Sequence, residues 1–160
     1  MTNALLTPEL AAHFAGPSMT ILAARDDRFR AAIARSMSIT CDTGTGHIDV
    51  FLTSAVWTDF MRAIKPGAVI AVTATHPGTY VSYQAKGAVE AIDPADDCEA
   101  ARTRLNIERM LTMLGTLGAT RRQLTHVFST DGLVRVRVRP TDIFAQTPGP
   151  GAGARIGAVA

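Results

Sequence analysis

The sequence predicts a mainly β domain of the α+β class, in which about six antiparallel strands form a small, closed or nearly closed barrel with short flanking helices. The first observation is that apolar and polar residues alternate, as they do most clearly near the C-terminus, where Val134, Val136 and Val138 alternate with arginines. The second is that tight turns or one short helix join successive strand-like runs, whereas parallel strands need longer crossovers. The third is length and composition, because 160 residues with 47% hydrophobic and 19% charged residues suit one domain with a buried core.

Helix signals appear at four places along the chain. Thr7 can cap a first helix with Pro8 in its first turn, and Gly16 followed by Pro17 ends that helix. A second helix is expected over 55–64 and the longest one after 93–94, with a further helical turn over 119–127. The second helix has an apolar stripe at helical spacing, which predicts its buried face: Trp57, Phe60, Met61 and Ile64.

Strands are expected over 18–24, 31–42, 47–53, 68–75 and 80–92, followed by the strand of alternating valines and arginines. We interpret 31–42 as one continuous strand. One of its faces carries only small side chains, which suggests that something bulky lies against it: Ala32, Ala34, Ser36, Ser38 and Thr40. Gly87, in the middle of the run 80–92, predicts a β-bulge or a close approach of another backbone.

Composition and motifs exclude several classes of function. Sixteen Lys+Arg against fourteen Asp+Glu give a net charge of +2, too near neutral for a dedicated nucleic-acid-binding protein. No apolar run approaches the roughly 18 residues of a membrane span, and no basic segment precedes an apolar one at the start, so we expect a cytoplasmic protein. Two cysteines and four scattered histidines lack the spacing of a metal site, and no nucleophile motif is present. We therefore nominate neither metal ligands nor catalytic residues.

Two polar rows remain as candidate sites. Tyr80, Ser82, Gln84 and Lys86 share one face of an expected strand, which either faces water or lines a pocket for a flat, hydrogen-bonding ligand. The arginines that alternate with the C-terminal valines form a solvated face, a protected edge, a dimer contact or an anion site.

Several of these segments together resemble the pyridoxamine 5′-phosphate oxidase-like family of FMN-binding split β-barrels. The strongest carrier is the stretch 79–87, Thr-Tyr-Val-Ser-Tyr-Gln-Ala-Lys-Gly. The other carriers are 31–36, the hairpin into 50–53, the helix 55–64, the strand 68–73 and the segment 142–149. The resemblance covers about 5–148, so we divide the chain into a split-barrel FMN-binding-like domain, 1–148, and a Gly/Pro/Ala-rich tail, 149–160.

The resemblance implies a homodimer with two FMN sites at the subunit interface, and an FMN-dependent oxidoreductase acting on an unspecified small molecule. In that family arrangement the flavin ring lies against the small-residue face of 31–42. By position, residues of three segments fall near the cofactor: Arg35, Ser36 and Met37 beside the ring, Thr53 and Ser54 near the phosphate, and Ser82 and Gln84 near the ring or ribityl chain.

The sequence departs from the family at the phosphate. Flavin-binding members commonly place basic residues after the third strand, whereas 54–58 of this chain has no cation. Arg35, Lys86 or Arg62 are the candidates to replace them, because ionic hydrogen bonds to phosphate are about twice as strong as neutral ones. The alternatives are a non-catalytic dimer that holds haem, a deazaflavin or another flat ligand, and a barrel with no cofactor. The last is favoured if Trp57 fills the phosphate position.

Overall fold

A computed structural model describes residues 5–124 and 127–156 of the chain, which contain eight strands and four helices. Seven strands form one curled sheet in the order β2-β1-β5-β6-β7-β4-β3, β8 pairs with β7, and each of these pairings is antiparallel. The bounds are α1 (Pro8–Ala15), β1 (Met19–Arg25), β2 (Ala31–Arg35), β3 (Ser38–Asp42), β4 (His47–Thr53), α2 (Thr58–Ala63), β5 (Val69–Thr75), β6 (Ser82–Pro94), α3 (Asp97–Thr116), α4 (Arg121–Leu124), β7 (Leu133–Ala145) and β8 (Arg155–Ile156).

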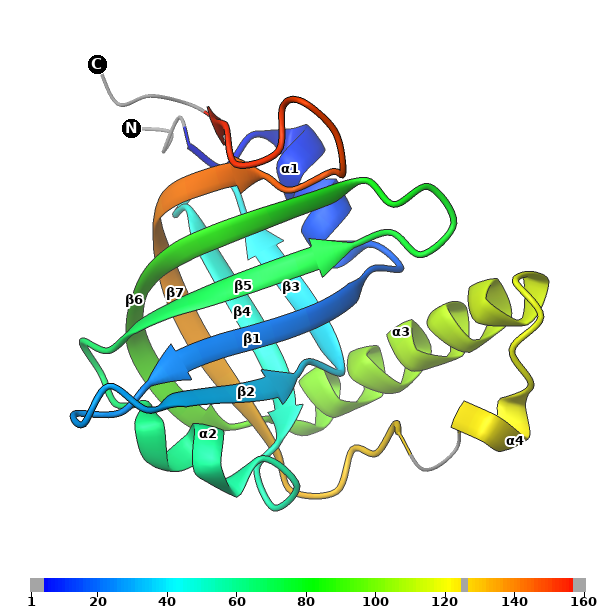
Figure 1. Ribbon diagram of the computed structural model, residues 1–160. Helices are drawn as coiled ribbons and strands as arrows, with labels where there is room; N and C mark the ends of the chain where they lie inside the picture. The colour runs from blue at the N-terminus through cyan, green and yellow to red at the C-terminus, as the bar shows by residue number, and fades with distance from the viewer. Residues whose placement is uncertain (1–4, 125–126, 157–160) are drawn as a thin grey trace.

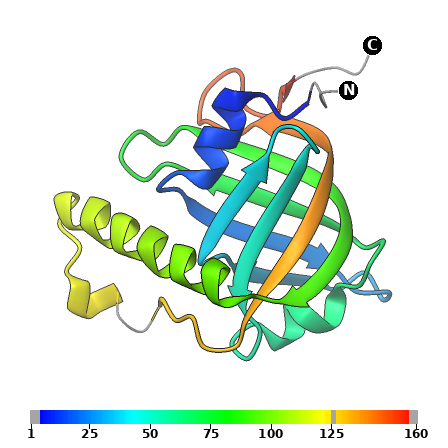
Figure 2. The same ribbon diagram turned by 180° about the vertical axis from the view of Figure 1, so that it is seen from behind.

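The sheet curls so that β1, β2, β5 and β6 lie opposite β3, β4 and β7 (Figure 1). The turned view in Figure 2 shows α1 at one end of the curled sheet and α2 towards the other, while α3 extends outward from the side. The fold class is confirmed: an antiparallel, mainly β half-barrel with short helices.

The two edges of the sheet meet where β2 passes into β3. The backbone amide of Ser36 donates to the Thr20 carbonyl oxygen at 3.2 Å, and the next amide, Met37, donates to the Phe51 carbonyl oxygen at 2.7 Å. The chain thus leaves β1 and joins β4 within two residues. Our prediction of one continuous strand over 31–42 is wrong, because this step transfers the chain from one sheet edge to the other.

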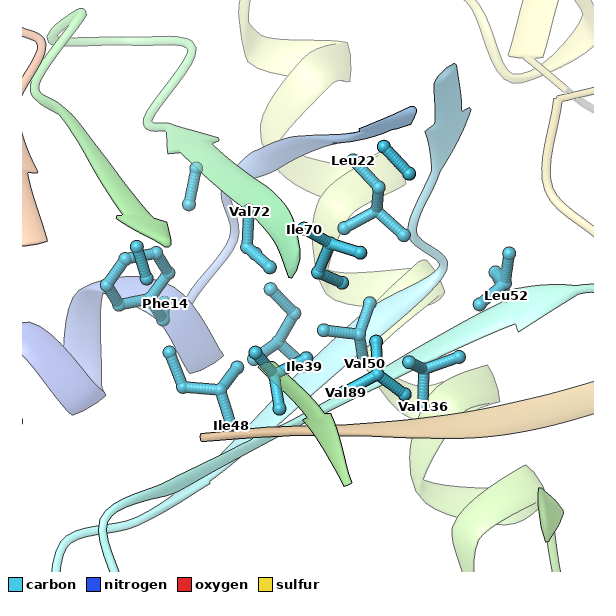
Figure 3. Close-up of a cluster of buried hydrophobic side chains, with 14 of the residues drawn as sticks. Phe14, Leu22, Ile39, Ile48, Val50, Leu52, Ile70, Val72, Val89 and Val136 are labelled. Carbon is cyan, nitrogen blue, oxygen red and sulfur yellow. The ribbon is translucent and has the colours of Figure 1, made fainter. Parts of the chain in front are cut away.

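The barrel core is built from inward-facing residues of both halves of the sheet. Figure 3 shows the side chains converging, and among the fully buried ones are Leu22, Ile48, Val50, Ile70, Val72 and Val136. Two phenylalanines from the helices complete this core, Phe14 of α1 and Phe60 of α2, which are 1% and 0% exposed. The cap expected for α1 is present, because the Leu10 amide donates to Thr7 Oγ1 at 3.3 Å.

The second helix is shorter than expected, since α2 begins at Thr58 after a turn rather than at residue 55. Its apolar stripe nevertheless packs as predicted, with Phe60 and Ile64 in the core and Trp57 and Met61 partly buried against it. Trp57 therefore lies against the barrel core, which keeps both ligand-binding hypotheses in place.

The pairing of β6 with β7 confirms the prediction for Gly87. The register shifts between Lys86 and Gly87, and a Cβ at Gly87 would lie 2.7 Å from the Arg139 carbonyl carbon and from Pro140 Cα. Only a residue without a side chain permits this close approach. The strand expected over 80–92 begins instead at Ser82, because Tyr80 stands in the preceding turn with φ of 60°.

The longest helix packs outside the barrel. Its start is fixed by a capping box between Asp96 and Glu99. Ile107 packs with Phe51 and Met37 in a second buried cluster. No helix among the described residues is long and apolar enough to cross a membrane.

The segment after β7 folds back on the sheet. Arg155 and Ile156 form β8 opposite Phe144 and Ile143, and Ile156 packs against the main core. The Gly/Pro/Ala-rich tail therefore contributes to packing through Ile156. The helical turn expected over 119–127 is present as α4, and residues 125 and 126 of that prediction lie outside the described part.

Candidate ligand-binding site

The outward side of β2, β1, β5 and β6, which we call the open face, is covered by none of the four helices α1 to α4 (Figure 1). Its residues alternate with core residues along each strand, as a half-buried sheet requires. Three large apolar side chains on it are strongly exposed: Ile21 at 46%, Ile33 at 61% and Val69 at 65%. Exposed apolar side chains on one face are common at interaction surfaces.

A strip of hydrogen-bonding groups runs beside these apolar residues. Thr75 Oγ1 and Ser82 Oγ are 2.7 Å apart, and Gln84 Nε2 donates to Thr73 Oγ1 at 2.8 Å. Both contacts join residues that face each other across β5 and β6. The amide oxygen of Gln84 and the second hydrogen of its NH₂ group take no part in this bond, so the strip retains a donor and an acceptor. Tyr80 is not part of the strip, because it precedes the strand.

Lys86 lies two residues further along β6 and is exposed. Its Nζ sits 4.9 Å from the ring centroid of Phe144, a cation–π contact. The carboxylate opposite it, Asp142, forms an ion pair with Arg155 instead.

Arg35 ends β2 at the margin of the open face. Its guanidinium donates to the thioether sulfur of Met19 at 2.8 Å and lies 5.3 Å from the ring centroid of Phe128. Burial lowers the pKa of Arg35 below the ordinary arginine value. Within 5–124 and 127–156, no carboxylate forms an ion pair with it.

The two residues after Arg35 point into the protein. Ser36 is 6% exposed, and its hydroxyl donates to the Ser38 carbonyl oxygen at 2.7 Å, while Met37 packs in the cluster beneath α3. Ala34 is in the barrel core, and Ser38 Oγ lies 2.9 Å from Thr103 Oγ1 of α3. The bulky neighbour expected against these small residues is therefore this chain's own core and helix.

Thr53 and Ser54 are held by the segment that precedes β7. Thr53 Oγ1 donates to the Ser129 carbonyl oxygen at 3.0 Å, and Ser54 Oγ donates to the Gly132 carbonyl oxygen at 3.1 Å. The helix α2 has only six residues, and its first turn begins at Thr58, four residues after Ser54. The structure therefore groups the candidate residues in two places, the strip on β6 and the ends of β2 and β4.

The arginine row of β7 is neutralised within the chain. Arg137 makes a bidentate pair with Asp49, at 2.8 Å for both bonds, and this pair raises the pKa of Arg137. Arg135 and Arg139 pair with acids too, and Arg139 also contacts His47. These acids are Asp93 and Glu99 for Arg135 and Glu90 for Arg139. Since β7 lies between β6 and β4, the edge-strand interpretation is wrong, and the row is a set of ion pairs.

No protein-family model and no curated protein sequence matches the chain. The solved structures that are similar to this chain share its fold, a split β-barrel built from one curled antiparallel sheet. An F420 reductase is similar, with 18% identity, a TM-score of 0.53, and coverage of 82% of this chain and 93% of that one.

A putative pyridoxamine 5′-phosphate oxidase from Lactobacillus delbrueckii has 14% identity and a TM-score of 0.52, with coverage of 91% and 100%. HutZ, a haem storage protein of Vibrio cholerae, has 10% identity and a TM-score of 0.50, with coverage of 88% and 94%. At such identities the likeness shows the shared fold.

Proposed function

We propose that two copies of the chain pack through their open faces around FMN, and that the protein is an FMN-dependent oxidoreductase acting on a small molecule. The observation that carries this proposal is the open face itself. It combines exposed apolar side chains with a hydrogen-bonding strip, which is the chemistry that a flat heteroaromatic ring requires. The neighbouring structures support a flat cofactor, since their names refer to F420, pyridoxamine phosphate oxidation and haem.

A second copy is part of the proposal because the open face of one chain gives a flat ring a single wall, and the hollows of about 380–410 Å³ lie at the margins of this face, around Asp26, Asp59 and Ala68. The cleft beside Arg35 has a free interior volume of about 20 Å³, whereas ligand pockets commonly have several hundred. A ring lying on the open face of a single chain leaves its other side in water. A partner face supplies the second wall, and it also covers the exposed isoleucines.

The residues have distinct roles in this proposal. Gln84 bonds the polar edge of the ring, and Ser82, which is only 4% exposed, borders this contact from its place in the strip. Lys86 contacts an oxygen of the ligand, while Arg35 stands at the margin. Ser36, Met37, Thr53 and Ser54 fix the backbone around that margin through their buried contacts. When bound, the flavin supplies the electron or hydride transfer, and these residues orient it and exclude water.

The test is a titration of the purified protein into FMN, in which the quenching of flavin fluorescence measures binding. We expect saturation at one FMN per chain. Gln84→Leu, which keeps the size of the side chain but removes its amide, is expected to weaken FMN binding by about tenfold. The matched control is Gln123→Leu on α4, which lies away from the open face and leaves affinity unchanged.

A wild-type protein that does not quench FMN contradicts the proposal. The same titration with haemin tests the main alternative, a non-catalytic haem-binding dimer, and haem binding without flavin binding decides in its favour.

A further inference from the structure

We propose that Arg35 binds the anionic group of the ligand, a phosphate or a carboxylate, in the cleft between the α1–β1 connection, the β2–β3 link and α3. The identity of the ligand's flat part rests on the proposed function. The anion site itself rests on the contacts of Arg35, and it can be tested separately.

The first argument is that no carboxylate of the described residues pairs with Arg35. The two half-buried arginines of β7, Arg135 and Arg137, each face at least one carboxylate. Arg35 instead donates to a thioether, which is a weak acceptor, and lies over a phenyl ring. Taking a cation out of water without an opposite charge is costly. An anion from outside the chain would offset this cost.

The second argument is the composition of the cleft. Four polar residues, Ser18, Arg35, Ser36 and Asn106, line it among apolar ones such as Phe128. Asn106 is half-buried on α3, and its side-chain amide makes no hydrogen bond to any other described residue. The NH₂ group of an unengaged amide is a donor to an anionic oxygen. The free volume of about 20 Å³ suits one oxygen atom or water molecule rather than a ring.

The third argument is that the other two candidate cations lack this combination. Arg62 is paired with Asp59 at 2.8 Å and also contacts Thr58. Lys86 is exposed, so water already solvates its ammonium group. Arg35 is the candidate whose charge is both withdrawn from water and unpaired in the described part of the chain.

The position of Arg35 also matches the hydrogen-bonding strip. Residues of four neighbouring strands are aligned across the sheet, from Arg35 through Ile21 and Thr73 to Gln84. The backbones of Arg35 and Gln84 are therefore three strand spacings apart. At about 4.8 Å per spacing this is roughly 14 Å between backbones. A ligand whose ring bonds Gln84 therefore needs an extended arm ending in an anion to reach Arg35. A flavin with a phosphorylated side chain has this form, and a macrocycle with carboxylate arms presents the same anionic chemistry.

The test compares FMN with riboflavin, which lacks the phosphate, in wild type, Arg35→Gln and Arg35→Lys. We expect wild type to bind FMN at least about tenfold more tightly than riboflavin, Arg35→Gln to bind both alike, and Arg35→Lys to keep part of the preference. Arg62→Gln is the control, because Arg62 lies on α2 and is already paired with Asp59. It is expected to keep the wild-type ratio.

A measurement without any flavin makes the test of the anion site independent of flavin binding. Inorganic phosphate, compared with chloride at equal ionic strength, is expected to raise the Tm of wild type and of Arg62→Gln but not that of Arg35→Gln. If haem binds in place of flavin, haemin and its dimethyl ester replace FMN and riboflavin.

The outcomes separate the two proposals. FMN binding with an unchanged FMN-to-riboflavin ratio in Arg35→Gln overturns the inference and leaves the proposed function. A ratio that Lys86→Ala abolishes and Arg35→Gln preserves overturns it too. Phosphate stabilisation that depends on Arg35, without any flavin or haem binding, supports the anion site and contradicts the proposed function. Equal phosphate effects in wild type and Arg35→Gln, again without flat-ligand binding, contradict both.

Discussion

Replacing Ile21 and Ile33 by glutamate is expected to convert the protein to monomers without unfolding it. Both side chains lie on the open face and are 46% and 61% exposed in the single chain. The fold of one chain therefore loses little apolar burial. A partner that packs on this face loses its apolar contact and meets two carboxylates.

The magnitude follows from the exposed fractions. Full burial of an isoleucine side chain contributes about 2 kcal/mol. The exposed parts of Ile33 and Ile21 are therefore worth about 1.2 and 0.9 kcal/mol, or roughly 2 kcal/mol per chain. A symmetric dimer buries both copies, so the loss is about 4 kcal/mol, a factor of roughly 1,000 in the dimer dissociation constant. Desolvation of the carboxylates adds to this loss.

Analytical ultracentrifugation over a concentration series measures this change, and thermal denaturation checks folding. Leu105→Glu is the control, because Leu105 is 52% exposed but lies on α3, away from the open face. It is expected to remain dimeric. A wild-type protein that is monomeric throughout, or a double variant with the wild-type dissociation constant, refutes the assignment of the open face as the interface.

Three further results are expected. Gly87→Ala should lower the free energy of unfolding by about 1–3 kcal/mol in a denaturant titration, because the added Cβ would collide with the backbone at Arg139. The control is Gly115→Ala in α3, where the Cβ meets open space and the change should be neutral or stabilising. Similar losses in both variants would contradict this prediction. Thr103→Val should cost about 1–3 kcal/mol, since it leaves a buried serine hydroxyl of β3 without its partner, and an unchanged midpoint would argue against that contact. The hydrogen bond from Arg139 lowers the pKa of Glu90 below its ordinary value of 4.5, so protonating Glu90 at low pH costs folding stability. The Tm should therefore fall as the pH drops below about 4.5, and it should fall less steeply in Arg139→Gln. Equal slopes in the two proteins would exclude this pair as a cause.

Patterns local in sequence predicted much of the fold. The cap at Thr7, the buried stripe around Phe60 and the close approach at Gly87 depend on spacing or on one special residue. The break between β2 and β3 could not be predicted in this way, because Ser36 and Met37 continue the alternation without a glycine or proline. The chain changes sheet edges between β2 and β3. The alternate positions that face outward in β2, such as Ile33, therefore continue in β3 as positions that face the core, such as Ile39.

The candidate site was less predictable because its properties depend on distant residues. The spacing of Ser82 and Gln84 placed them correctly on one face of β6. The arginines of β7 look free in the sequence, and only the fold brings an acid such as Asp49 opposite Arg137. Conversely, nothing near Arg35 in the sequence shows that no carboxylate in the described part of the chain pairs with it. No local pattern marks Asn106 as a neighbour of its cleft.

The central claim is that the open face binds a flavin, and an absorption spectrum tests it most directly. The purified protein is measured before and after incubation with excess FMN and desalting. The account predicts a retained flavin band with quenched fluorescence, which disappears in the Ile21→Glu/Ile33→Glu variant. A protein that stays colourless after desalting contradicts the claim, and a Soret band in its place assigns the face to haem.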